Sequence, residues 1–253
     1  MHKEHEEILN EVLNEKHEPK PDSKAWKPIY TIISLFLALI LVAWIIPSYV
    51  VKIDPIPKDI PTYDEVVPEF EFTENDKHAI LSHQDYLLFL DSSNPLIKQI
   101  ATKIATESCE SGSRVCQAKA LFYFVRDEFD YVSESDEYIE TAEEVLITGG
   151  SDCDGAAVLL ANLMQSIGIP AQFAFVPKHV FVQVYLNEAL NKYKLEDGWI
   201  NVDPTCRYCD FGEIPGKYAD IEIEIVSPYS YWPGASSAWV SDCRPYLTKG
   251  LHW

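Results

Sequence analysis

The sequence lacks a basic stripe: 20 lysines and arginines stand against 40 aspartates and glutamates, for a formal net charge of −20. Nucleic-acid binding depends on clustered Lys and Arg, so we do not expect this chain to bind nucleic acid. Internal repeats and low-complexity blocks are also lacking. With 47% hydrophobic and 24% charged residues among 253, the composition is that of a globular protein, long enough for one domain with appendages.

Residues 29–51 lack charge altogether. At 1.5 Å per residue, a helix of this length crosses a hydrocarbon core of about 30 Å, so we predict a transmembrane helix. A cleaved signal peptide would carry a shorter apolar run near the chain start and end in small residues, whereas this run ends in Trp44, Ile45 and Ile46. A buried core helix is the other alternative, which is disfavoured by aromatic residues near both ends, as in membrane belts: Trp26, Tyr30, Trp44 and Tyr49.

Basic residues near the apolar run indicate its orientation. Four lysines precede it and two follow closely: Lys16, Lys20, Lys24, Lys27, then Lys52 and Lys58. By the positive-inside rule the N-terminus is cytoplasmic. We therefore expect a cytoplasmic tail (1–28), a single transmembrane helix (29–51), an extended Pro-rich linker (52–75) and a domain outside the cytoplasm (76–253).

The thiol of Cys153 lies where a helix is predicted to begin. Ser151 or Asp152 can cap that helix, an apolar stripe follows at three- and four-residue spacing, and Gly168 with Pro170 closes it. Two further helices precede it, one of them with Ile97, Ile100 and Ile104 on one stripe. A helix N-terminus favours a thiolate and can receive an oxyanion, but Asp152 and Asp154 oppose the first effect.

A reactive thiol needs a base, and the sequence offers few. His78, His83 and His179 remain once the histidines of the tail and of the chain end are set aside. Of these, only His179 opens a segment with strand alternation, "HVFVQVYL".

A second predicted strand, "GWINVDPT", brings a carboxylate to that histidine. If the two strands pair antiparallel about Asn191, residue 181 lies opposite 201 and His179 opposite Asp203. Equal parity puts both side chains on one face, where the carboxylate could orient the imidazole as the third group of a triad.

Three ordered segments, "GGSDCDGAAVLLANLMQSIGIPAQFAF", "KHVFVQVYL" and "WINVDPT", resemble the core of the transglutaminase-like superfamily over residues 141–205. With the apolar run, the resemblance is to a membrane-anchored prokaryotic type. It implies a papain-like α+β fold, with a central helix packed on an antiparallel sheet, and a Cys-His-Asp triad formed by Cys153, His179 and Asp203. Phe181 and Gln183 depart from the family's frequent Trp and acidic residue, which bears on substrate preference.

The predicted function is therefore that of a membrane-anchored thiol enzyme acting on amide bonds of proteins or peptides, by acyl transfer, deamidation or proteolysis. No cofactor or metal is required; some relatives use calcium, but acidic residues alone do not make a calcium site. The alternative is a non-catalytic surface scaffold or peptide-binding module with the same fold.

The other five cysteines are expected to form disulfides outside the cytoplasm. The simplest pairing joins Cys109 to Cys116, and Cys243 to Cys206 or Cys209, leaving one thiol over. A zinc site from Cys206, Cys209, Cys243 and one further cysteine is the alternative.

Overall fold

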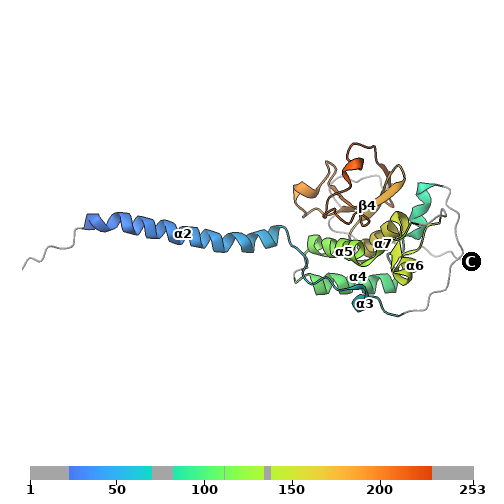
Figure 1. Cartoon of the computed structure of the whole chain (residues 1–253), viewed down its shortest axis with the longest axis horizontal. Coiled ribbons are helices and arrows are strands. Elements are labelled where there is room, and N and C mark those ends of the chain that lie inside the picture. The colour runs from blue at the N-terminus through green and yellow to red at the C-terminus, as the bar shows by residue number, and fades with distance from the viewer. Residues whose placement is uncertain (1–22, 70–81, 111, 134–137, 230–253) are drawn as a thin grey trace, which may run out of the picture. The chain divides into compact units, whose positions relative to one another are not determined.

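The computed structural model describes residues 23–69, 82–110, 112–133 and 138–229 (Figure 1). Two compact units make up the chain, Met1–Lys52 and Ile53–Trp253. Most of the predicted tail, together with His78 and Cys243, lies outside the described residues.

The first unit contains helix α2 (Ser23–Ile53), which covers the predicted span and extends beyond it at both ends. Its apolar window, Pro28–Ile46, is 19 residues long, and none of these residues is buried in the protein. At 1.5 Å per residue this window is about 28 Å long, close to the thickness of a hydrocarbon core. One N-terminal helix is thus long and apolar enough to cross a membrane.

The segment after α2, which lies in the range of the predicted extended linker, packs on the domain. We use the name strap for residues 54–67, which belong to the second compact unit. Short helix α3 (Tyr63–Val66) lies within it, and Val66 is buried in the main core. The Tyr63 N–H donates to Glu128 at 2.9 Å and its hydroxyl donates to the Leu146 carbonyl.

Helices form one side of the domain. The 3-10 helix η1 (His83–Phe89) comes first, followed by α4 (Pro95–Ser108), α5 (Arg114–Glu128), α6 (Ala142–Thr148) and α7 (Cys153–Ser166). Capping side chains start most of them, for example Asn94 at α4 and Ser113 at α5, because each accepts a first-turn N–H. Helix α7 is buried almost throughout and contacts α4, α5 and α6.

A four-stranded antiparallel sheet covers α7 from the other side. Its order is β5 (Trp199–Val202), β4 (His179–Tyr185), β3 (Ala171–Val176) and β6 (Glu224–Val226). Val180, Val182 and Val184 of β4 belong to the main core with α7, whereas Phe181 packs in a second cluster with Tyr218. Strands β1 (Asp130–Tyr131) and β2 (Gly150–Ser151) form a separate parallel pair, and η2 (Asn191–Tyr193) and η3 (Gly216–Tyr218) lie in loops. The predicted α+β fold, with a central helix on an antiparallel sheet, is confirmed.

The predicted pairing of β4 with β5 was wrong by two residues. Val182 pairs with Val202 and Gln183 with Asn201, so Phe181 and not His179 comes level with Asp203. The reason is the connection, which is not symmetric about Asn191. The connection ends in a tight turn, with Gly198 at φ 87° and a hydrogen bond from the Leu195 N–H to the Trp199 carbonyl. This turn moves the centre of the strand pairing one residue toward the C-terminus. Since the error is even, His179 and Asp203 keep their common face.

Candidate active site

A sharp change of direction places Cys153 at the start of α7. Gly149, at φ 69°, ends α6, and strand β2 leads directly into the next helix. Asp152 caps α7 by accepting the Asp154 N–H at 2.9 Å. Cys153 is therefore the first residue of the helix, as the sequence predicted.

The sulfur of Cys153 has two polar neighbours. Its S–H donates to Asp154 Oδ1 at 3.5 Å, and the backbone N–H of Val180 donates to the sulfur. Burial, and then the charge of Asp154, raise the pKa of the Cys153 thiol to about 12, although the Val180 N–H opposes them. At neutral pH the resting sulfur is a thiol, because the helix dipole does not outweigh burial and two carboxylates.

His179 and Asp203 meet in a hydrogen-bonded pair. Nε2 of His179 lies 2.8 Å from Asp203 Oδ2, and this carboxylate is fully buried. Its other oxygen accepts from the N–H and the hydroxyl of Thr205, at 3.0 and 2.8 Å. The imidazole stacks on Tyr218 with ring centroids 5.0 Å apart and 11° between planes. With Nε2 engaged, Nδ1 is the nitrogen that can exchange a proton with a nucleophile.

Of the three predicted residues, the structure joins His179 to Asp203 and places Cys153 beside the residue that follows His179. The sulfur is hydrogen-bonded to Val180, the residue next to His179, while His179 is bonded to Asp203. Within the part of the chain that the structure describes, no hydrogen bond joins the sulfur to the imidazole. The thiol proton is directed to Asp154 instead.

Tyr86 was missed by the sequence reasoning. It lies in η1, 6% exposed, and its hydroxyl hydrogen-bonds the Asp154 carboxylate. Burial, followed by the charge of Asp154, raises the pKa of Tyr86 well above 10, so the phenol keeps its proton. No pattern in the sequence pairs the two residues, because the contact joins a short irregular helix to a distant one.

The two departures from the family pattern are interior residues. Phe181 is fully buried in the cluster with Tyr218, and its ring centroid lies 6.2 Å from that of the imidazole. Gln183 is 2% exposed and is held by Gln172 and Asn201 through hydrogen bonds of 2.9 Å each. Both positions support the sheet beneath His179 and are covered from solvent.

The other candidate residues lie elsewhere. His83 is exposed, stacks on Phe175 and lies 3.0 Å from Glu224. Disulfides join Cys109 to Cys116, as predicted, and Cys206 to Cys209. The second bridge was not predicted, and it removes the two thiolates that the zinc alternative required.

Donor atoms of Asp152, Cys153 and Asp154 lie within 4.8 Å of one another, the one such acid-thiol group among the described residues. Hydrogen bonds to the Asp154 N–H, the thiol and Tyr86 already engage these groups. Their positions are explained without a metal.

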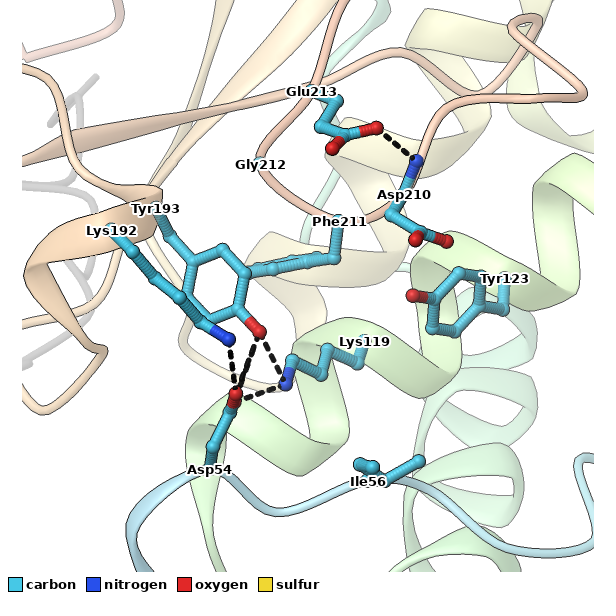
Figure 2. Close-up of a pocket in the computed structure, with 10 residues that line it drawn as sticks. All are labelled: Asp54, Ile56, Lys119, Tyr123, Lys192, Tyr193, Asp210, Phe211, Gly212 and Glu213. Atoms are coloured by element: carbon cyan, nitrogen blue, oxygen red, sulfur yellow. Dashed lines mark hydrogen bonds and ion pairs between the residues drawn. The ribbon is translucent and has the colours of Figure 1, made fainter.

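A cavity of about 410 Å³ lies at a different place in the domain. Its lining is drawn from the strap, α5, η2 and the loop after β5, and includes none of the three predicted site residues: Asp54, Ile56, Lys119, Tyr123, Lys192, Tyr193, Asp210, Phe211, Gly212 and Glu213 (Figure 2). Most of its charged groups bond one another, and we therefore describe it as a structural junction.

A family model matches the part of the chain that carries the site. Residues 98–204 match the family model of the transglutaminase-like superfamily, a range that contains Cys153, His179 and Asp203. No curated protein matches the chain. Among solved structures, a "Putative Cysteine Protease" from Cytophaga hutchinsonii is 19% identical with a TM-score of 0.35; the match covers 48% of this chain and 42% of that one. Residues 98–204, the part of the chain that carries the site, are thus similar to the transglutaminase-like superfamily, and this similarity supports a family of thiol enzymes.

Proposed function

We propose that this protein is a membrane-anchored thiol enzyme, of a prokaryotic type, that acts on amide bonds of proteins or peptides. The proposed nucleophile is Cys153, the proposed base is His179, and Asp203 orients the base. The observation that carries the proposal is the 2.8 Å bond between His179 Nε2 and the buried Asp203, beside the N–H that holds the sulfur. A buried carboxylate on one imidazole nitrogen fixes the tautomer that accepts a proton on the other.

The proposed reaction begins when His179 Nδ1 takes the thiol proton and the sulfur attacks the amide carbonyl carbon. The oxygen of that carbonyl becomes an oxyanion, which the free N–H groups at the α7 N-terminus can stabilise. Collapse of this intermediate breaks the C–N bond, and the imidazolium returns the proton to the departing amine. The thioester then reacts with water, giving hydrolysis or deamidation, or with an amine, giving a new amide.

The proposed location follows from α2 and from its flanking charges. A span of 19 apolar residues anchors the chain, and the excess of lysine before it favours a cytoplasmic N-terminus. The domain then faces an oxidising compartment, which is consistent with disulfides at Cys109–Cys116 and Cys206–Cys209.

A non-catalytic binding module is the second candidate, and one observation favours it. The Cys153 thiol has a pKa of about 12 and points its proton to a carboxylate, which is the state of an unreactive cysteine. A binding module with this fold would keep the His179–Asp203 bond for packing alone.

Labelling of the full-length chain in detergent micelles separates the two candidates. The probe is iodoacetamide, applied without reductant so that the disulfides stay closed, and the modified cysteine is identified by peptide mass spectrometry. With an enzyme, Cys153 is labelled in the folded protein and His179→Ala slows this at least tenfold. The matched control, His83→Ala, removes a histidine whose partners are Glu224 and Phe175 and should leave the rate unchanged. Equal rates in all three proteins would exclude a triad.

Turnover is tested with glutamine-containing peptides, with and without a primary amine. A mass increase of about 1 Da indicates deamidation, a larger adduct indicates amine transfer, and shorter products indicate proteolysis. Cys153→Ser must abolish whichever product is found. A folded chain that labels at Cys153 but converts no peptide in the screen would favour the binding module.

A further inference from the structure

The carboxylate of Asp154 lies between two proton donors that come from different parts of the chain. The Cys153 S–H donates to it at 3.5 Å, and the buried hydroxyl of Tyr86 donates to it from η1. None of these bonds is needed to start α7, because Asp152 supplies the cap. The bonds to the Asp154 carboxylate therefore serve something other than helix initiation, and one of them binds the thiol proton.

Tyr86 is held rigidly relative to α7. Its ring makes edge contacts with Phe173 and Phe175 of the sheet, at centroid distances of 5.4 and 4.7 Å. The end of η1 and the chain just after it are bonded to α7 by the Asn162 side chain, which donates to the Phe89 carbonyl at 2.8 Å and accepts the Asp91 N–H at 2.7 Å. The helix that carries Asp154 thus also fixes the segment that carries its phenol partner.

The charges around the sulfur favour a retained proton. The titratable groups that interact with the sulfur or with its partner Asp154 are Asp152 at the N-cap of α7, Asp154 itself, Tyr86 on η1, Tyr131 on β1 and His179 on β4. Four of these five are acids, and only His179 can accept a proton productively. Asp154 is the one acid among them whose carboxylate receives the S–H.

We propose that Asp154, oriented by Tyr86, is a latch that holds the proton of Cys153 in the resting site and must release it before His179 can take it. This inference rests on the proposed function, because it regulates the same nucleophile. In the latched state the S–H donates to the carboxylate and no bond forms or breaks. On release, the S–H turns from Asp154 to Nδ1 of His179, the proton moves to the imidazole, and Asp154 remains a carboxylate.

The latch keeps the Cys153 thiol unreactive when no substrate is bound. A thiolate on a protein surface is open to oxidation and to stray electrophiles, and reactivity follows the thiolate fraction. A substrate that contacts Asp154 or displaces it from the sulfur would activate the nucleophile only when a target is bound.

The test compares alkylation of Cys153 at several pH values in the full-length chain. Asp154→Asn removes the charge while keeping similar size, so the apparent pKa of the thiol falls. At a pH below the pKa of the thiol, each unit by which this pKa falls raises the thiolate fraction tenfold. We therefore expect labelling of Asp154→Asn at pH 8 to be at least tenfold faster than that of the parent protein. The matched control is Asp130→Asn, an exposed acid paired only loosely with Arg207, which should label like the parent protein.

Tyr86→Phe should change the labelling rate of Cys153 in the opposite direction. Without the phenol donor the Asp154 carboxylate is more basic and holds the S–H more firmly, so labelling at pH 8 slows two- to fivefold. General loosening of the site would speed labelling in both variants. Faster labelling of Tyr86→Phe, or no change in Asp154→Asn, would overturn the latch.

The outcomes for the latch and for the triad are separable. If His179→Ala is without effect while Asp154→Asn accelerates labelling, the proposed function fails and the control of the proton by Asp154 stands. If His179→Ala slows labelling and Asp154→Asn does not accelerate it, the triad stands and the latch fails. Near-UV circular dichroism checks folding, and Asp154→Ser, which also removes the charge, replaces the Asn variant if that protein does not fold.

Discussion

Asp54 fastens the strap to the domain through a single carboxylate. It bonds Lys119 of α5, Lys192 at 2.7 Å and the Tyr193 hydroxyl at 2.8 Å (Figure 2). The Lys119 side chain is only 4% exposed and donates also to the Pro55 carbonyl and to Tyr193. Replacing Asp54 by Asn removes the charge that compensates a buried ammonium, so we expect Asp54→Asn to destabilise the domain.

The magnitude follows from the pKa of Asp54. Partial burial alone would raise it, but hydrogen bonds from Lys119, Lys192 and Tyr193 outweigh burial and lower the pKa from 3.8 to about 2. That difference corresponds to about 2 kcal/mol of folding free energy at neutral pH. Removing one partner of a fully buried pair costs about 3 to 5 kcal/mol. Because Asp54 is 17% exposed and Lys119 keeps two neutral acceptors, we expect Asp54→Asn to lower the free energy of unfolding by about 2 kcal/mol.

Thermal unfolding of the full-length chain in detergent, followed by near-UV circular dichroism, measures this loss. For a domain of this size, about 2 kcal/mol lowers the midpoint by about 4–8 °C. The pKa of Asp54 is depressed in the folded state, so its stabilisation is complete above the unfolded value and is lost as pH falls through about 2. The difference between variant and parent should therefore be constant above pH 5 and shrink between pH 4 and 2.

Asp59→Asn is the control, since Asp59 is an exposed acid of the same strap at φ 47°, a conformation that Asn adopts readily. A midpoint for Asp54→Asn equal to that of Asp59→Asn would refute the reasoning. The strap would then be held by Tyr63 and Val66, without a contribution from the ion pair.

Three further outcomes are expected. Gly155→Ala should destabilise by about 1–3 kcal/mol, because a Cβ there would collide with Ser151 and lie 2.9 Å from Val145; Gly112→Ala, with open space around it, should not shift the thermal midpoint. Replacing both Cys109 and Cys116 by Ser should cost about 2–3 kcal/mol in urea unfolding, since the bridge closes a short loop; an unchanged urea midpoint would contradict this. Asp203→Asn should reduce peptide turnover by about 10³–10⁴-fold with little change in KM, because the imidazole loses its oriented tautomer; a loss below tenfold would argue against the triad.

Local patterns were enough to predict the central elements of the fold. The stripe after Cys153 predicted α7, the isoleucine spacing predicted α4, and the alternation after His179 predicted β4, because each pattern reflects which face of one element is buried. The packing of the strap on the domain was not predicted, for the complementary reason. Its prolines correctly exclude a long helix, but they carry no information on whether an extended segment packs on a domain.

The pairing of His179 with Asp203 was predicted on the correct face from an incorrect register, and the geometry of a sheet explains why. Side chains alternate with period two, so an error of two residues preserves the face, whereas an error of one would have moved Asp203 to the opposite side. No such parity relates Tyr86 to Asp154, or Asp54 to Lys119, which are 65 residues apart. Those contacts depend on the packing of whole segments, so a single sequence can predict which face a residue takes but not which distant residue meets it there.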